Sequence, residues 1–224
     1  MTLNRASKKE ADARLSLLRK QVSLHVFTLR FEDSACREAR SAAEELAETT
    51  NRLSVEIDDA AECGDLLRKF RIDALPAIVA EAKNAPDLRL YGAPTGYGLI
   101  ALLDALTAVG GNAEPRPDLF DAVSAAAGGG IRSSVHVDLI GSRRSAATVE
   151  AAAALWRVAC ADQAGGGHLR LVAALRLIED FPLWSASAPP DAAREALPFL
   201  LLDGRAVLSW PFADTDIAAA LGGA

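Results

Sequence analysis

The sequence contains no CxxC motif. Its three cysteines, Cys36, Cys63 and Cys160, lie far apart in the chain, and this arrangement excludes the disulfide framework of a small secreted protein. The residues around Cys63 and Cys160 form no catalytic or binding motif, so we interpret both cysteines as packing residues in the core or at the surface. The three histidines match no metal-ligand spacing. We therefore expect neither a bound metal nor a cofactor.

Long hydrophobic runs and an excess of basic residues are missing as well. No apolar stretch reaches the roughly 20 residues that a membrane-spanning helix needs. Residues 1–21 mix basic with acidic side chains, unlike a secretory signal peptide, so we expect a cytoplasmic protein with no membrane partner. The 24 Lys and Arg residues stand against 30 Asp and Glu, a net charge of −6. This balance disfavours nucleic acid as a partner.

Aromatic residues make up only 5% of the chain, so Ala, Leu and Val must supply most of the core. Their periodicity predicts short strands and amphipathic helices. In the first half we expect a helix at 7–19 with Ser7 as N-cap, a strand at 23–30, a helix at 34–49 with Asp33 or Ser34 as its cap, a strand at 53–58, a helix at 60–71, strands at 77–80 and 88–91, and a helix at 97–109. Alternating strands and helices predict parallel pairing, and the last two strands predict an antiparallel addition.

The second half repeats this order. The expected elements are a helix at 119–127, a strand at 134–140, a helix at 146–161, a strand at 168–174, strands at 198–202 and 205–210 around an Asp203–Gly204 turn, and a last helix capped by Asp214 or Thr215; residues 176–196 show no clear pattern. A repeat of about 110 residues predicts two α/β domains. They span 1–110 and 119–224, with a linker at 111–118, and each has a mixed central sheet flanked by helices, in the order of the thioredoxin fold.

The segment Asp33-Ser-Ala-Cys36 lies between an expected strand and an expected helix. Thioredoxins carry their CxxC motif at this place, where the helix N-terminus stabilises a thiolate. In this register Cys36 takes the second, resolving position and Asp33 takes the position of the nucleophile. A carboxylate can cap a helix but cannot attack a disulfide. The alternative interpretation is that Cys36 is only a small, half-buried residue of the first helical turn.

Two Ala-Leu-Pro segments precede strands, one ending in Leu75-Pro76 and the other in Leu197-Pro198. A proline that opens a strand is also ordinary at a sheet edge. Thioredoxin folds place a cis-proline here, beside the active-site loop, where the neighbouring backbone pairs with an extended substrate. We expect both prolines to be cis and their surroundings to bind a partner.

The segment Ser142-Arg-Arg-Ser145 occupies the second half's equivalent of the CxxC position. Serine hydroxyls cannot form a disulfide, and no His–Asp pair is spaced to activate them as nucleophiles. One interpretation is that Ser142 caps the following helix and that both arginines are solvated. The other is that Arg143 and Arg144 bind an anionic group or a partner.

The segment from Leu88 to Leu103, LRLYGAPTGYGLIALL, is similar to a RFxGxPxGxEFxxLxxxL motif. That motif is found in tandem-thioredoxin protein disulfide oxidoreductases and in the N-terminal domain of the alkyl hydroperoxide reductase flavoprotein subunit. The resemblance covers roughly residues 10–220 and is weak after 175. It implies electron transfer through a CxxC in one or both halves. Both CxxC positions are altered here, and the flavoprotein's flavin and nicotinamide domains are absent from the sequence.

These features leave several functions open. The first is a binding or scaffold protein that keeps the cis-proline groove for another protein and has lost the dithiol. The second is a monothiol oxidoreductase or redox sensor that uses Cys36. A third, a different enzyme on this fold, needs a polar pocket that the sequence does not reveal.

Overall fold

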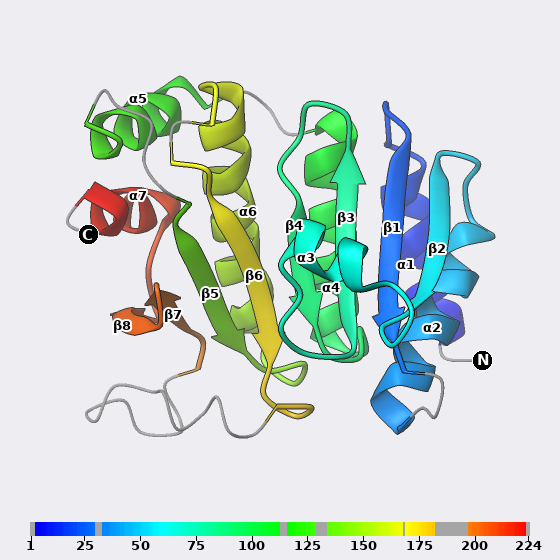
Figure 1. Cartoon of the computed structure of the whole chain (residues 1–224). Helices are drawn as coiled ribbons and strands as arrows, with labels where there is room; N and C mark the ends of the chain where they lie inside the picture. Colours follow the sequence, from blue (N-terminus) through cyan, green and yellow to red (C-terminus); the bar gives the residue numbers. More distant parts are fainter. Residues whose placement is uncertain are drawn as a thin grey trace.

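The computed structural model describes residues 3–29, 33–112, 116–128, 134–167, 169–181 and 197–222, and Figure 1 shows the whole chain. Parts of several regions discussed above fall outside these ranges. They include the last residue of the strand expected at 23–30, the middle of the expected linker at 113–115, the first residue of the strand expected at 168–174, most of the segment 176–196, and the last two residues of the second expected domain.

A single eight-stranded sheet runs through the molecule, in the order β2-β1-β3-β4-β6-β5-β7-β8. The strands are β1 (Val22–Thr28), β2 (Leu53–Asp59), β3 (Ala77–Ala82), β4 (Leu88–Tyr91), β5 (His136–Gly141), β6 (Val172–Leu177), β7 (Phe199–Leu202) and β8 (Arg205–Ser209). Read as two groups of four, the order is β2-β1-β3-β4 and then β6-β5-β7-β8. The first two strands in each group are parallel and the others are antiparallel additions. The two halves therefore share one strand arrangement.

The two groups of strands join edge to edge. Strand β4 pairs with β6 in parallel, from Leu88 opposite Ala173 to Tyr91 opposite Arg176. Behind this junction the Trp156 indole N–H donates to the carbonyl of Ala101 at 3.2 Å, and the Trp156 side chain is buried. Sequence periodicity did not predict this pairing, because it reveals strands but not which edges meet. The limits of the two domains and of their linker stay a prediction.

Most helices cover one face of the sheet. The helices are α1 (Arg5–Leu15), α2 (Ser34–Ala47), α3 (Gly64–Phe70), α4 (Tyr97–Thr107), α5 (Pro117–Ala126), α6 (Ala146–Ala164) and α7 (Asp214–Gly222), with a π-helical turn, η1 (Ala108–Asn112), after α4. In Figure 1, α1, α4 and α6 lie behind the strands and α3 lies in front of them. The larger core cluster is built mainly of Leu, Ala and Val side chains from both halves. The mixed α/β architecture expected from the sequence is confirmed.

Two helices begin at other residues than expected because side-chain and backbone hydrogen bonds set their first turns. Helix α1 begins earlier than expected, since the side chain of Asn4, not of Ser7, accepts the capping bond, from the N–H of Ser7 at 2.9 Å. Helix α3 begins at Gly64 because Asp59 accepts from the N–H groups of residues 61, 62 and 63 and holds them in a turn.

Strand β6 also starts later than expected, at Val172. The carboxylate of Asp162 accepts from the N–H of Leu169 at 3.0 Å and from the N–H of Leu171 at 3.1 Å. These bonds hold the segment in a loop, in which Arg170 has a φ of 47°. Most of the other elements lie within about three residues of their expected bounds.

No helix in the described ranges is long and apolar enough to cross a membrane.

Candidate functional site

The first candidate loop ends at the start of α2. Asp33 has extended backbone angles and is the N-cap, and its carboxylate accepts from the N–H of Cys36 at 2.9 Å. The capping role predicted for Asp33 is therefore confirmed. Asp33 is exposed, whereas Cys36, at the third position of the helix, is only 2% exposed. Asp33 thus presents a carboxylate to solvent at the start of α2, and Cys36 lies buried behind it.

Pro76 lies beside this loop. Phe27 pairs with Ala77 in the antiparallel β1–β3 ladder, so the next residues along, Thr28 and Pro76, face each other where β1 runs into the loop. The Leu75–Pro76 peptide bond is cis. The carbonyl of Pro76 accepts from the N–H of Gly92 at 2.9 Å, whereas Leu75 forms no backbone hydrogen bond with the described residues.

The second candidate loop, Ser142–Ser145, is hydrogen-bonded to the carboxylate of Glu179. The hydroxyl of Ser142 donates to the Glu179 carboxylate at 2.5 Å and accepts from the N–H of Arg144 at 3.1 Å. Ser142 is 8% exposed. The expectation that Ser142 caps α6 is wrong: Ser145 is the N-cap residue, and its side chain makes no capping bond.

Arg143 ties this second loop to the first half of the chain. Its guanidinium donates to Asp180 at 3.1 Å and to the hydroxyl of Thr95 at 3.2 Å, and it lies 3.8 Å from the Glu38 carboxylate on α2. The other oxygen of Asp180 accepts from the N–H of Ala93 at 2.8 Å. The interpretation of two solvated arginines therefore fails for Arg143, which is half-buried in this network.

Backbone contacts complete the junction. The carbonyl of Arg143 accepts from the N–H of Tyr97 at 3.0 Å. A Cβ atom on Gly96 would lie 2.5 Å from that carbonyl oxygen, and Gly96 has a φ of 55°, so only glycine allows this approach. Arg144 points away from the network and is exposed. The second loop is thus a structural joint between the halves.

Pro198 repeats the position of Pro76. Ile140 pairs with Phe199, so Gly141 faces Pro198, and the Leu197–Pro198 bond is cis. The carbonyl of Pro198 accepts from the N–H of Trp210 at 3.0 Å, as that of Pro76 accepts from the residue after β4. A third cis bond, Trp210–Pro211, was not expected from the sequence.

All three cysteines are free thiols. Cys63 is the residue before α3 and not part of the helix as expected, and burial, assisted by nearby Asp58, raises the pKa of its thiol. Burial raises the pKa of the Cys160 thiol on α6 to about 11. Raised values leave both thiols protonated at neutral pH, so neither is an activated nucleophile. Among the described residues, no three His, Cys, Asp or Glu side chains are grouped to hold a metal ion.

Sequence reasoning missed a row of charged side chains at the β4–β6 junction. The guanidinium of Arg176 donates to both carboxylate oxygens of Asp73 at 2.9 Å, binds the carboxylate of Asp138, and lies 4.3 Å from the centre of the Tyr91 ring. Arg176 is buried on β6, where a charge is costly unless it is paired. An arginine within an otherwise apolar strand was the only signal in the sequence, because its partner Asp73 lies 103 residues away.

Comparison with known proteins then places the fold. No family model and no curated protein matches the sequence, but solved structures do. The NTD_N/C domain of alkyl hydroperoxide reductase AhpF from Enterococcus faecalis aligns with 98% of this chain and 99% of its own, at 18% identity and a TM-score of 0.78. A protein disulfide oxidoreductase from Aeropyrum pernix aligns with 99% of this chain and 93% of its own, at 14% identity and a TM-score of 0.82.

The chain has a thioredoxin-like fold. A third structure, Sso1120 from Sulfolobus solfataricus, aligns with 90% of the chain and 98% of its own, at 9% identity and a TM-score of 0.57. At these identities the likeness concerns the fold, and the resemblance noted in the sequence between Leu88 and Leu103 agrees with it. Within the thioredoxin-like fold, activity depends on the particular residues at each loop.

Proposed function

We propose that this chain is a thioredoxin-like protein that binds an extended segment of another protein beside Pro76 and does not exchange disulfides. The observation that carries the proposal is the position of Asp33 and the hydrogen bond that its carboxylate accepts. Asp33 stands where a dithiol oxidoreductase has its attacking cysteine, and its carboxylate is held by the Cys36 N–H at 2.9 Å. An exposed carboxylate at a helix N-terminus stabilises the helix, and it offers a disulfide no nucleophile.

The binding half of the proposal rests on Leu75. Its N–H and carbonyl have no backbone partner among the described residues, and it precedes a cis-proline at the mouth of the first loop. An extended peptide can pair with such free backbone groups as an added strand. The partner is therefore a protein segment without secondary structure of its own, recognised through its main chain.

The second loop supports a scaffold role more than a catalytic one. Ser142 and Arg143 are occupied by Glu179 and Asp180, so this loop fixes the orientation of the two halves. Pro198 and Leu197 form the equivalent groove of the second half, and the exposed Arg144 lies at the same loop. We assign these residues a secondary part in binding.

A second candidate function uses Cys36 as a single redox thiol. The observation in its favour is the place of Cys36 in the first turn of α2, where the helix dipole favours a thiolate. Such a thiolate would attack one sulfur of a partner's disulfide, form a mixed disulfide, and release the other sulfur as a thiolate. The 2% exposure of Cys36 opposes this reaction, because a protein disulfide must reach the sulfur.

Peptide selection tests the binding proposal. Random peptides displayed on phage are selected on the full chain, and the best binders are measured by titration calorimetry. Leu75→Pro removes the N–H that would pair with a peptide, so we expect about tenfold weaker binding. The matched control is Leu197→Pro in the second half, for which we expect a smaller loss. Equal affinity for the unchanged chain and Leu75→Pro would contradict the proposed groove.

A further inference from the structure

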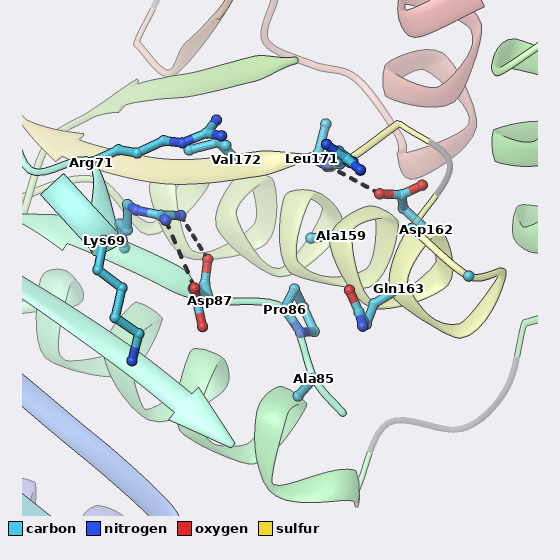
Figure 2. Close-up of a pocket in the computed structure, with 14 residues that line it drawn as sticks. Lys69, Arg71, Ala85, Pro86, Asp87, Ala159, Asp162, Gln163, Leu171 and Val172 are labelled. Atoms are coloured by element: carbon cyan, nitrogen blue, oxygen red, sulfur yellow. Dashed lines mark hydrogen bonds and ion pairs between the residues drawn. The ribbon is translucent and has the colours of Figure 1, made fainter. Parts of the chain in front are cut away.

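A polar pocket of about 350 Å³ lies at the junction of the halves, at the end of the sheet opposite the two candidate loops. It is bounded by the end of α3, the turn between β3 and β4, the end of α6 and the loop that leads into β6 (Figure 2). Strand β6 begins at the pocket with Val172 and runs away from it toward Asp180, which contacts the second loop. The pocket is therefore separate from the proposed peptide groove.

Positive charge gathers in this pocket although the chain as a whole is acidic. The charged residues that line it are the cations Lys69, Arg71, Arg89 and Arg170 and the carboxylates Asp87 and Asp162. The carboxylate of Asp162 is occupied by two backbone N–H groups, those of Leu169 and Leu171. In Figure 2 this carboxylate turns toward Leu171. Both oxygens of Asp162 are therefore bound to the loop backbone, and among the described residues Asp162 forms no ion pair with an arginine.

Arg89 is the buried cation of the group, with 5% of its surface exposed. Its Nε donates to the carbonyl of Phe70 at 2.7 Å and its Nη1 to the carbonyl of Asp87 at 2.9 Å, whereas the Asp87 carboxylate is 4.0 Å from its Nη2. Burial lowers the pKa of Arg89 and raises that of Asp87. A guanidinium held mainly by neutral carbonyls is poorly compensated, and a second anion nearby would stabilise it.

Two further arginines, Arg71 and Arg170, line the pocket. Among the residues that the structure describes, neither Arg71 nor Arg170 forms an ion pair with a carboxylate; Nη1 of Arg71 lies 3.5 Å from Nε2 of His136, and both arginines are exposed. Both have backbone angles in the left-handed region, with φ of 52° and 47°. In Arg71 this conformation ends helix α3, and in Arg170 it belongs to the loop that Asp162 holds. Lys69, by contrast, is paired with Glu81 at 2.9 Å.

We propose that this pocket binds a small phosphate-bearing molecule. Two exposed arginines that form no ion pair with the described residues, in one pocket with the buried Arg89, match a phosphate group, which carries a charge of about −1.5 to −2 at pH 7. Arginine also presents its donors in the planar fork that suits phosphate oxygens. The pocket is at the lower end of the range of small-molecule sites, about 300 to 1,000 Å³, and it leaves room for the group that bears the phosphate.

Calorimetric titration of the full chain with inorganic pyrophosphate tests the site. We expect saturable binding at low ionic strength that weakens as salt is added. Arg71→Gln and Arg170→Gln keep polar, exposed side chains, and each should weaken binding about tenfold. The matched control is Arg205→Gln, an exposed arginine on the outer strand β8, which should leave the affinity unchanged.

Three results would overturn the proposal. The first is no binding of pyrophosphate up to about 10 mM. The second is an equal loss of affinity in Arg205→Gln and in the pocket variants, which would mean unspecific attraction. The third is equally tight binding of citrate, since a general polyanion site would not select phosphate. Because the pocket lies away from Leu75 and Pro76, failure here would leave the peptide-binding proposal standing.

Discussion

The two candidate loops occupy equivalent places in the two halves and are built differently. Before α2, Asp33 is exposed and caps the helix, with Cys36 buried behind it. Before α6, Ser142 is buried under Glu179 and Arg143 reaches across to Thr95 and Asp180. Both loops lack a dithiol and lie beside a cis-proline, but Ser142 and Arg143 of the second loop are hydrogen-bonded to Glu179 and Asp180, whereas Asp33 of the first loop is exposed. The position of a loop in a fold therefore does not define its role.

The largest expected effect comes from restoring sulfur to each loop. Asp33→Cys creates a CxxC with an exposed first cysteine at a helix N-terminus, where the thiolate is favoured. We expect this variant to reduce the disulfides of insulin well above background. Ser142→Cys combined with Ser145→Cys creates the same motif in the second half. We expect that variant to stay at background, because the loop is enclosed by the junction.

One control variant and one contradicting outcome complete this comparison of the two restored motifs. Asp33→Ser removes the carboxylate without adding a thiol and should remain inactive, which controls for a change of charge alone. Activity of the second-half double variant equal to that of Asp33→Cys would show that the second loop is open. Our distinction between an open loop and a structural joint would then be wrong.

The second expected effect concerns the reactivity of the Cys160 thiol in the second half. Burial raises the pKa of Cys160 to about 11, against about 8.5 for an unperturbed thiol. The thiolate is the reactive form, so at pH 8 Cys160 should react with iodoacetamide roughly a hundredfold more slowly than a free cysteine. Its rate should rise with pH up to the raised pKa. Mass spectrometry of the alkylated sites gives the rates, and a Cys160 rate equal to that of free cysteine would contradict the burial.

The third effect concerns the stability of the junction. Asp180→Ala removes the partner of Arg143 and of the Ala93 N–H, and its side chain is only 10% exposed. We expect the free energy of unfolding to fall by about 2 kcal/mol, measured by urea denaturation. Asp12→Ala, an exposed carboxylate on α1, is the control and should change it by less than about 0.5 kcal/mol. Similar values for the two variants would mean that the second loop does not hold the halves together.

The smallest effect is expected at the first loop. Asp33→Ala removes the N-cap of α2 and should lower the free energy of unfolding by about 1 kcal/mol. Asp33→Asn can still accept the Cys36 N–H and should come close to the unchanged chain. A larger loss for Asp33→Ala than for Asp180→Ala would reverse the roles that we assign to the two loops.

The sequence predicted the local features of this fold and missed its long-range ones. Asp33 as a cap, the strands before Pro76 and Pro198, and the repeat of the strand order all follow from patterns within about ten residues. The pairing of β4 with β6 and the role of Arg143 do not, because the residues that meet there lie far apart in the sequence. Nothing in the sequence around Asp180 indicates that its carboxylate is buried. Only the fold brings it into contact with Arg143 and Ala93.

The central claim is that this chain binds without exchanging disulfides, and the insulin reduction assay tests it most directly. The unchanged full chain is incubated with insulin and dithiothreitol, with thioredoxin as positive control. The account predicts that insulin precipitates no faster than in the absence of the chain, because Asp33 supplies no attacking thiol. Turnover above that background, lost again in Cys36→Ser, would contradict the claim and establish Cys36 as a redox site.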